Sequence, residues 1–489
     1  MNLQVKKMLK FIPLLLVLLV SASPAFATGD DTPLGLLLPT WSIIPFVGML
    51  LSIAIFPIVN GHWWEHNLGK VSAFWALLFF VPFFIGFGAE EAIYQLLHQV
   101  ILDYIPFIVL LLGLFAVAGG IVLRGSLAGT PKVNLIFLII GAVLASWIGT
   151  TGAAMLLIRP LLRANAWRKR SKHSVIFFIF LVCNVGGALT PVGDPPLFLG
   201  FLRGVPFFWT LSHLLMPFLL NSVILLVVYF IIESNMYKKD LAEVGGKVPA
   251  DEGDGKLRIE GLHNLIFIFM IVGAVILSGV LSTSSVFADP STGTLYGFKL
   301  FSHHGHDIVW SYLDLLRTAI ILLAAFLSMK TTSKDSRAFN RFNWGPIEEV
   351  AKLFIGIFLT MIPAMAILAA RGGELGLHSA HQFFWVTGAL SSFLDNAPTY
   401  LVFLTTAGSL GASEGVVTTL GTVDPHLLMA ISAGAVFMGA NTYIGNAPNF
   451  MVKSIAEENG IQMPSFFGYI GWSVAFLIPL FIINTFLFF

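Results

Sequence analysis

Two twelve-residue stretches near opposite ends of the chain align without a gap: GALTPVGDPPLF from Gly187 to Phe198, and GANTYIGNAPNF from Gly439 to Phe450. Six of the twelve positions are identical. Each copy lies in a long apolar run, yet it carries Gly, Pro, Thr and an Asp or Asn. Such residues are costly at membrane depth unless the freed backbone lines a cavity. Interruptions at matching positions in two halves of a membrane protein are typical of a transporter's binding site.

The composition indicates an integral membrane protein. Of the 489 residues, 57% are hydrophobic and 11% are charged, whereas about 25% is usual for charged residues in soluble domains. The net charge of +1 gives no field that would attract nucleic acid, so no nucleic-acid partner is expected. The single Cys183 excludes an internal disulfide and a multi-cysteine metal site. The expected partners are the lipid bilayer and a small inorganic ion or small organic anion.

The N-terminus has the pattern of a bacterial secretory signal peptide over residues 1–27. Three lysines precede an apolar stretch, and a small-residue segment follows it. An uncleaved signal anchor is the alternative, and both place Thr28 outside the cytoplasm. We therefore expect a multi-pass protein of the bacterial inner (plasma) membrane.

Ten apolar runs are long enough to cross a bilayer, which takes about 20 residues. They cover residues 34–60, 71–88, 99–123, 174–200, 213–233, 262–282, 310–329, 349–370, 426–452 and 465–489.

Two further apolar stretches, 133–162 and 382–408, have polar centres that read SWIGTTGAA and SFLDNAPTY. We interpret each as a re-entrant hairpin of two half-length helices. With this topology, eighteen Lys and Arg residues fall on the cytoplasmic side and three fall outside, namely Arg203, Lys299 and Arg371. A simple span at 133–162 would instead place the basic run 163–172 outside, against the positive-inside rule.

The predicted fold is an all-α polytopic membrane protein with inverted repeats, each containing a re-entrant hairpin and a broken transmembrane helix. The first repeat covers 71–233 and starts from the cytoplasm, whereas the second covers 310–489 and starts from outside. Residues 234–309 form a cytoplasmic linker, a connecting helix and an outer loop, and 34–60 form a peripheral transmembrane helix. The polar part of the linker, 234–261, is expected to be a mobile loop.

Two carboxylates at membrane depth are the strongest candidates for chemistry. Asp194 lies in the first broken span and Asp395 at the second hairpin tip. Each could instead cap a half-helix. A neutral Asn or Ser would cap at lower desolvation cost, so we favour ion or proton binding, with Na⁺ at Asp194 and Asp395 as the hypothesis.

Hydroxyl and amide groups accumulate at the same helix breaks, and together with unwound carbonyls they are suitable ligands for Na⁺. The candidates for ion or substrate binding are Thr150, Thr151, Asn184, Thr190, Asp194, Asp395, Asn396, Asn441, Thr442 and Asn446. Helix N-termini also favour anions. Each repeat contributes one acid and no equally placed Lys or Arg, which favours a cation. Arg159 is the nearest candidate anion partner, and we interpret it as a helix-end anchor.

Other polar residues receive structural interpretations. His303, His304 and His306 are assigned to a solvated loop, and His62 with Glu65 to an interfacial aromatic loop. Asp314 and Arg317, one turn apart, are interpreted as a structural ion pair near the outer interface. Glu348 and Glu349 are interpreted as capping a helix start.

With these motifs the chain resembles the ion transporter superfamily, on the branch of NhaD-type sodium/proton antiporters, arsenite permeases and citrate-type transporters. NVGGALTPVGDPPLF at 184–198 and SSFLDNAPTYLVF at 391–403 are the most specific segments. The resemblance implies a scaffold and a moving transport part, a homodimer, and ions bound at hairpin tips and broken helices. The Ser-Asn-Thr tips of dicarboxylate carriers are absent, since this chain has GTTG and LDNAPT.

The sequence thus predicts a secondary transporter that exchanges Na⁺ or Li⁺ for H⁺ by alternating access. No enzyme activity and no cofactor are expected, with Na⁺ and H⁺ acting as transported or coupling ions. The alternatives are Na⁺-coupled transport of citrate or another organic anion, an arsenite permease and, from a different class, a membrane-embedded enzyme or scaffold.

Overall fold

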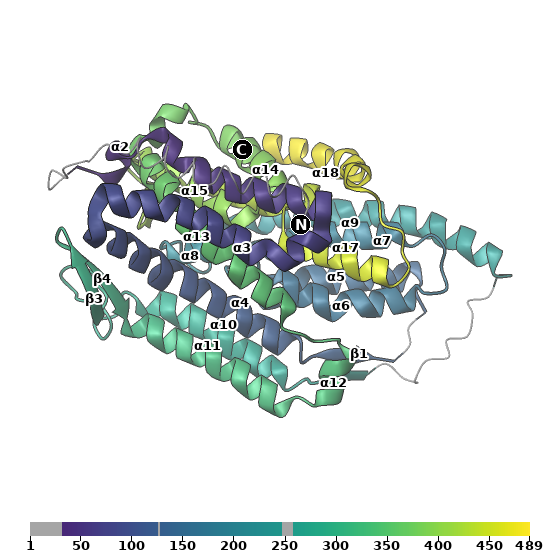
Figure 1. The fold of residues 1–489 in the computed structure, drawn as a ribbon. Coiled ribbons are helices and arrows are strands. Elements are labelled where there is room, and N and C mark those ends of the chain that lie inside the picture. Colours follow the sequence, from purple (N-terminus) through teal and green to yellow (C-terminus); the bar gives the residue numbers. More distant parts are fainter. Residues whose placement is uncertain (1–31, 126–127, 247–257) are drawn as a thin grey trace.

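The computed structural model describes residues 32–125, 128–246 and 258–489 (Figure 1). The predicted signal peptide therefore lies outside the described residues. Within them the chain is mostly helical, with three small two-stranded antiparallel sheets. Eight of the described helical segments are long and apolar enough to cross a membrane. The prediction of an all-α polytopic membrane protein is confirmed.

The first three predicted spans differ from the prediction because they belong to one helical run, Thr40–Ala118. The backbone leaves the helical conformation at Asn60 and Gly88, so single residues make the bends for which loops were expected. The segments on either side of Asn60 pack together, and Trp75 Nε1 donates to Ser52 Oγ at 2.9 Å. This region contains α2 (Leu34–Leu37), η1 (Thr40–Ile43), α3 (Ile44–Leu97), the π-helix η2 (His98–Tyr104) and α4 (Ile105–Ala118).

Both predicted hairpins are present as pairs of helices, and both predicted broken spans are interrupted at the twelve-residue motifs. The first set contains α5 (Pro131–Ile148), α6 (Thr150–Ala164), α7 (Lys172–Leu181), η3 (Val185–Leu189), α8 (Pro195–Leu202) and α9 (Trp209–Glu243). The second set contains α14 (Ala380–Phe393), α15 (Asn396–Ser409), α16 (Pro425–Met438), η5 (Gly439–Asn441), α17 (Ala447–Glu458) and α18 (Phe466–Phe488). The elements follow in the same order, while the exact repeat boundaries stay a prediction.

The remaining elements connect these sets. They are β1 (Val122–Arg124), β2 (Arg258–Glu260), α10 (Asn264–Leu281), β3 (Gly297–His303), β4 (His306–Ser311), α11 (Tyr312–Thr331), α12 (Lys334–Phe339), α13 (Gly345–Arg371), η4 (Gly372–Leu375), β5 (Val416–Thr418) and β6 (Gly421–Val423). Strand β1 pairs with β2, β3 with β4, and β5 with β6. The predicted ion pair within α11 is confirmed, with Arg317 Nη2 2.8 Å from Asp314 Oδ1.

Two predicted loops are structured in the part that is described; residues 247–257 of the predicted linker loop lie outside the described residues. Helix α9 continues to Glu243, past its predicted end at 233, because the loop before α7 supplies charge partners. There Arg170 Nη1 lies 2.8 Å from Asp240 Oδ1 and its other nitrogen pairs with Glu243. The histidine-rich outer segment is the β3–β4 hairpin, and His303 Nε2 lies 2.9 Å from Glu91 Oε2 on α3. The described residues contain no group of three His, Cys, Asp or Glu that could hold a metal ion.

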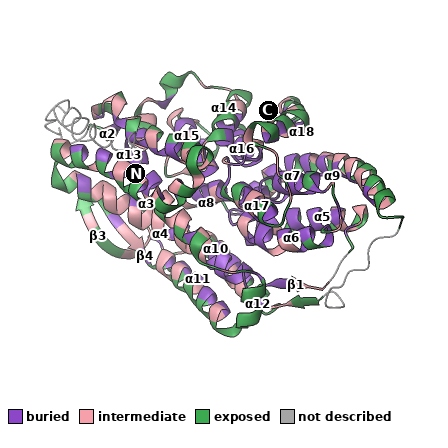
Figure 2. Ribbon diagram, turned by 45° about the vertical axis from the view of Figure 1, so that its right-hand side comes forward, coloured by how far each residue is buried: buried purple, intermediate pink, exposed green. Residues whose placement is uncertain are grey.

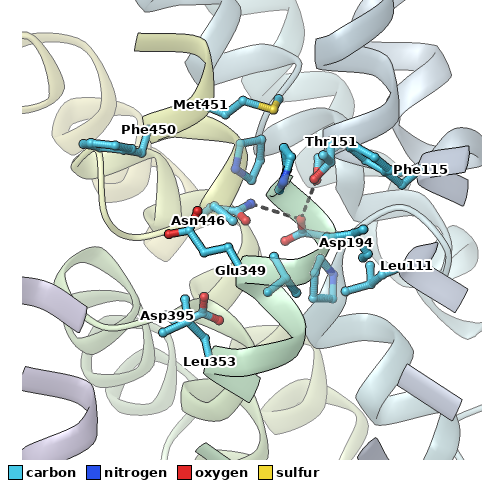
Figure 3. Close-up of a pocket in the computed structure, with 18 of the residues that line it drawn as sticks. Leu111, Phe115, Thr151, Asp194, Glu349, Leu353, Asp395, Asn446, Phe450 and Met451 are labelled. Atoms are coloured by element: carbon cyan, nitrogen blue, oxygen red, sulfur yellow. Dashed lines mark hydrogen bonds between the residues drawn. The ribbon is translucent and has the colours of Figure 1, made fainter. Parts of the chain in front are cut away.

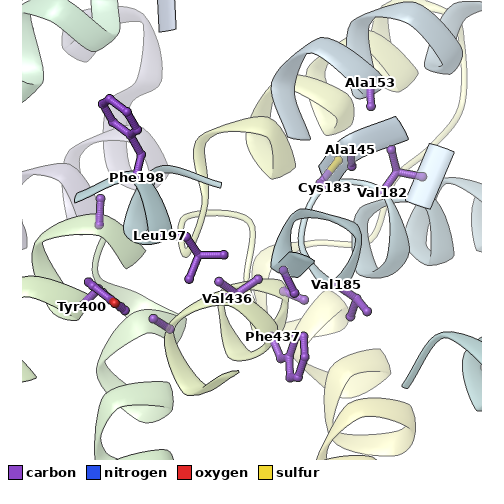
Figure 4. Close-up of a cluster of buried hydrophobic side chains, with 14 of the residues drawn as sticks. Ala145, Ala153, Val182, Cys183, Val185, Leu197, Phe198, Tyr400, Val436 and Phe437 are labelled. Atoms are coloured by element: carbon purple, nitrogen blue, oxygen red, sulfur yellow. The ribbon is translucent and has the colours of Figure 1, made fainter. Parts of the chain in front are cut away.

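The helices form two groups that matter for the site. Helices α3, α4, α10, α11 and α13 pack against one another and are called the panel helices below (Figure 1). Helices α5 to α9 and α14 to α18 form the hairpin body. Its centre is the segment Lys172–Leu189, which contains α7 and η3 and is 94% buried (Figure 2). Apolar side chains including Val185, Leu197 and Val436 fill the space where the two broken helices meet (Figure 4).

Candidate functional site

The two broken helices have matching backbone geometry. Asp194 precedes α8 and Asn446 precedes α17, both in extended conformation, and a proline follows each within two residues. Close backbone approach explains the glycines, because a Cβ on Gly193 or Gly445 would collide with the carbonyl oxygen of Gly187 or Gly439. The duplicated motif therefore encodes a tight unwound segment that ends in a polar residue.

The two hairpins hold these unwound segments through matching serines. Ser146 on α5 and Ser392 on α14 each offer a backbone carbonyl to a threonine of the adjacent broken segment, Thr190 and Thr442 respectively. Each serine hydroxyl also donates to a backbone carbonyl of that segment, with distances of 2.5 and 3.0 Å. Thr190 and Thr442 thus hold the helix breaks in place, and both are fully buried.

Both hairpin tips and both broken helices meet at Asp194. Its Oδ1 accepts a hydrogen bond from Thr150 Oγ1 at the first hairpin tip, at 3.0 Å. The same oxygen accepts from Asn446 Nδ2, also at 3.0 Å (Figure 3). Its Oδ2 accepts from Asn396 Nδ2 at the second hairpin tip, at 2.7 Å. Its carboxylate makes no capping bond to α8, so the cap interpretation is wrong for its side chain. Three donors directed at one carboxylate stabilise its charged form.

Asp395 has a different environment. Its Oδ1 accepts from the backbone nitrogen of Ala397 at 3.0 Å, so this carboxylate does cap α15. The residue is partly exposed, and it lines a cavity together with Asp194. Capping uses one of its oxygens and is compatible with ion binding by the other.

On the side away from the cavity, buried amide side chains form hydrogen bonds that hold Asn446 in place. Asn184 Nδ2 donates to Asn449 Oδ1 at 2.8 Å, and Asn446 Nδ2 approaches Asn184 Oδ1 at 3.4 Å. Asn449 Nδ2 also donates to the carbonyls of Gly439 and Thr442 within the break. The sequence motifs do not single out Asn449 as a site residue. Its position matches the apolar Leu197 in the first copy, and that mismatch was the available signal.

A cavity of about 330 Å³ lies between the panel helices and the hairpin body. Phe107 and Leu110 of α4 and Leu353 of α13 form its panel side, while both hairpin tips and both broken helices form the other. We call the end near the exposed Glu65 and Phe450 the mouth, and the end near the fully buried Phe107 the deep end.

The charged residues that line the cavity are all acidic. Four carboxylates line it, those of Glu65, Asp194, Glu349 and Asp395, and Figure 3 shows three of them around the same space. Among the described residues that line the cavity there is no Lys, Arg or His. Arg159, the candidate anion partner, is absent from this lining. The sequence predicts an interfacial loop at Glu65 and a helix cap at Glu349, and it does not predict that both line the cavity.

The candidate residues divide by position. Those that line the cavity are Thr150, Thr151, Asp194, Asp395 and Asn446. Those that lie behind it and hold the breaks or the lining residues are Asn184, Thr190, Asn396, Asn441 and Thr442. Asn441 belongs to the second group because its Nδ2 donates to Ser392 Oγ at 2.9 Å.

A protein-family model described as "Putative citrate transport" matches residues 36–489, which is nearly the whole chain. The chain belongs to this citrate-transport family. It is therefore a transporter of the ion transporter and citrate transporter-like group, as the motifs predicted. No curated protein matches it in sequence. Membership of the citrate-transport family makes the acidic lining the central question, because citrate is an anion.

Proposed function

We propose that the protein is a secondary transporter that exchanges Na⁺, or Li⁺, for H⁺ by alternating access. The observation that carries this proposal is the cavity with four carboxylates and no basic side chain among its described lining residues. At an effective dielectric constant of about 20, two like charges roughly 8 Å apart repel by about 2 kcal/mol. Several such repulsions, each between a carboxylate of the cavity and one of citrate, oppose the binding of bare citrate. The same carboxylates of the cavity attract a cation.

The exchange follows from competition for the same oxygens. Asp194 and Asp395 bind Na⁺ when ionised and release it when protonated, so the two cations cannot occupy the site together. The hydroxyl and amide groups around Asp194 supply neutral ligand oxygens. The cavity lies between two groups of helices, so movement of one group past the other would expose the same residues to each side. A dimeric assembly in the bacterial inner membrane is part of this proposal.

Na⁺-coupled citrate transport is the second candidate, because the family description names citrate. In that case Na⁺ would first cover the carboxylates, and the anion would then bind to the sodium ions and to helix N-termini. Its signature is citrate uptake that stops when Na⁺ is removed.

The test uses purified protein in liposomes with an imposed pH gradient and an internal pH-sensitive dye. Added Na⁺ should collapse the gradient, and Asp395→Asn should abolish the response at an unchanged protein level. Asp335→Asn is the matched control, because Asp335 lies exposed on α12. Full exchange by Asp395→Asn would refute the assignment of this acid. Uptake of radiolabelled citrate that requires Na⁺, without any proton response, would favour the second candidate.

A further inference from the structure

An ion pair lies just beyond the deep end of the cavity. Arg203 Nη2 is 2.6 Å from Asp103 Oδ2, and the two side chains are 11% and 2% exposed. Asp103 also accepts from Gln99 Nε2 at 2.9 Å. Asp103 precedes the cavity-lining Phe107 by one helical turn, so both lie on the same helix face. The pair therefore occupies the position where a passage from the cavity to the opposite side would run.

The pair joins the two groups of helices. Asp103 lies in η2, the π-helical turn that leads into panel helix α4. π-Helical segments are rare and are frequent at functional sites. Arg203 ends α8, whose first residue Pro195 lines the cavity, and its backbone carbonyl accepts from Thr419 in the β5–β6 hairpin of the body. Relative movement of the panel and the body would act directly on this contact.

The mouth carries charges of one sign, whereas the deep end has a pair of opposite charges. Glu65 and Glu349 carry like charges there and come from two panel helices. Glu458 lies on α17 one helical turn after the cavity-lining Ser454, and its contact with Arg341 is long, at 3.9 Å, with side chains that are 66% and 62% exposed. Exposed pairs of this kind contribute little. A buried pair of opposite charges lies at one end, and the exposed Glu65 lies at the other. The cavity is therefore open at the mouth and closed at the deep end.

We propose that the Asp103–Arg203 ion pair is the gate of the deep end and has to separate before the site opens on the side opposite the mouth. The proposal rests on transport by alternating access and adds residues outside the candidate ion site. While the gate is closed, each charge satisfies the other in a dry environment. When it opens, water enters and hydrates both. Removing either charge should shift the equilibrium toward the state that is open opposite the mouth.

The test is cysteine accessibility in vesicles of known orientation. Cys183→Ser removes the single native cysteine, and Leu111→Cys then places one thiol in the cavity lining. A membrane-impermeant maleimide should reach this thiol from the mouth side and react slowly from the opposite side. Asp103→Asn or Arg203→Gln should speed the reaction from the opposite side by about tenfold. The exchanged pair, Asp103→Arg with Arg203→Asp, should return it toward the original rate.

Asp314→Asn is the matched control, because the ion pair that it removes lies within α11 and does not connect the panel helices to the hairpin body. Its labelling should equal that of the parent protein. Unchanged labelling from the opposite side in both gate variants would overturn the proposal, and so would an equal increase in the control.

Two further outcomes keep the test decisive. If the single variants fail to fold, Asp103→Cys with Arg203→Cys in the Cys183→Ser background should be inactive when joined by a short thiol cross-linker and active after its cleavage. Transport that continues in the cross-linked protein would overturn the gate.

The labelling experiment does not depend on which ion is transported. A protein that labels as expected but moves no Na⁺ would therefore contradict the proposed function and leave the gate intact.

Discussion

Asp194 accepts hydrogen bonds from donors on three other segments, so these three bonds form only when those segments are assembled. The sequence identified Asp194 and Asp395 because an acid inside an apolar run is conspicuous. It did not identify Glu65 and Glu349, which follow polar segments where acids are ordinary. Their convergence on one cavity depends on how α3 and α13 pack, and a single sequence does not contain that packing.

Thr150 and Thr151 are adjacent in sequence but differ in contacts. Thr150 donates to Asp194 and is 1% exposed, while Thr151 lines the cavity without that bond. A hydrogen bond to a charged group is worth about 1.5–3 kcal/mol, so Thr150→Val should weaken the apparent Na⁺ affinity by roughly ten- to hundredfold. Thr151→Val should have a smaller effect. Exchange rates measured against Na⁺ concentration decide this, and equal losses in both variants would argue against the hydrogen bond to Asp194.

Glu349 and Glu348 provide a second neighbouring pair. Glu349 lines the cavity, whereas Glu348 is exposed and pairs with Lys352 at 2.5 Å. Charges near a mouth attract ions most strongly at low ionic strength, so Glu349→Gln should raise the apparent KM for Na⁺ by about two- to fivefold there and less in high salt. Glu348→Gln should change neither value. A salt-independent effect, or an equal effect of both variants, would contradict this role.

At the scale of elements, helix breaks and hairpins were predictable because Gly, Pro and polar residues in apolar runs have few other structural explanations. The continuous run from α3 to α4 was not, since Asn60 and Gly88 alone give no signal that distinguishes a sharp bend from a short loop. The extension of α9 was missed for another reason. Its polar end has no apolar periodicity, and its charge partners Arg168 and Arg170 belong to a distant loop.

The glycine pairs of the two breaks should be intolerant of even a methyl group. A Cβ on Gly445 would lie 2.5 Å from the Gly439 carbonyl oxygen, and Gly193 has the equivalent conflict. Gly445→Ala should therefore destabilise the protein by about 1–3 kcal/mol. Gly273→Ala on α10 meets no atom within 4 Å and serves as the control. The midpoint of thermal unfolding in detergent measures this. An unchanged midpoint for Gly445→Ala would show that the break can relax.

At the scale of the whole molecule, the panel helices and the hairpin body enclose one acidic cavity between them. The sequence anticipated two such parts through its resemblance to the superfamily, and the family match supports transport. From the positive-inside rule we expect the end of the molecule that carries most Lys and Arg to face the cytoplasm. The ion pair at the other end was not predictable, because it joins residues 100 positions apart.

The most direct test of the central claim is the flux of radiolabelled Na⁺ into proteoliposomes that have a more acidic interior. The same preparation is then assayed with radiolabelled citrate. We predict Na⁺ uptake driven by the outward proton gradient, lost in Asp194→Asn, with no citrate uptake in the absence or presence of Na⁺. Citrate accumulation that requires Na⁺, with no proton-driven Na⁺ uptake, would contradict the account.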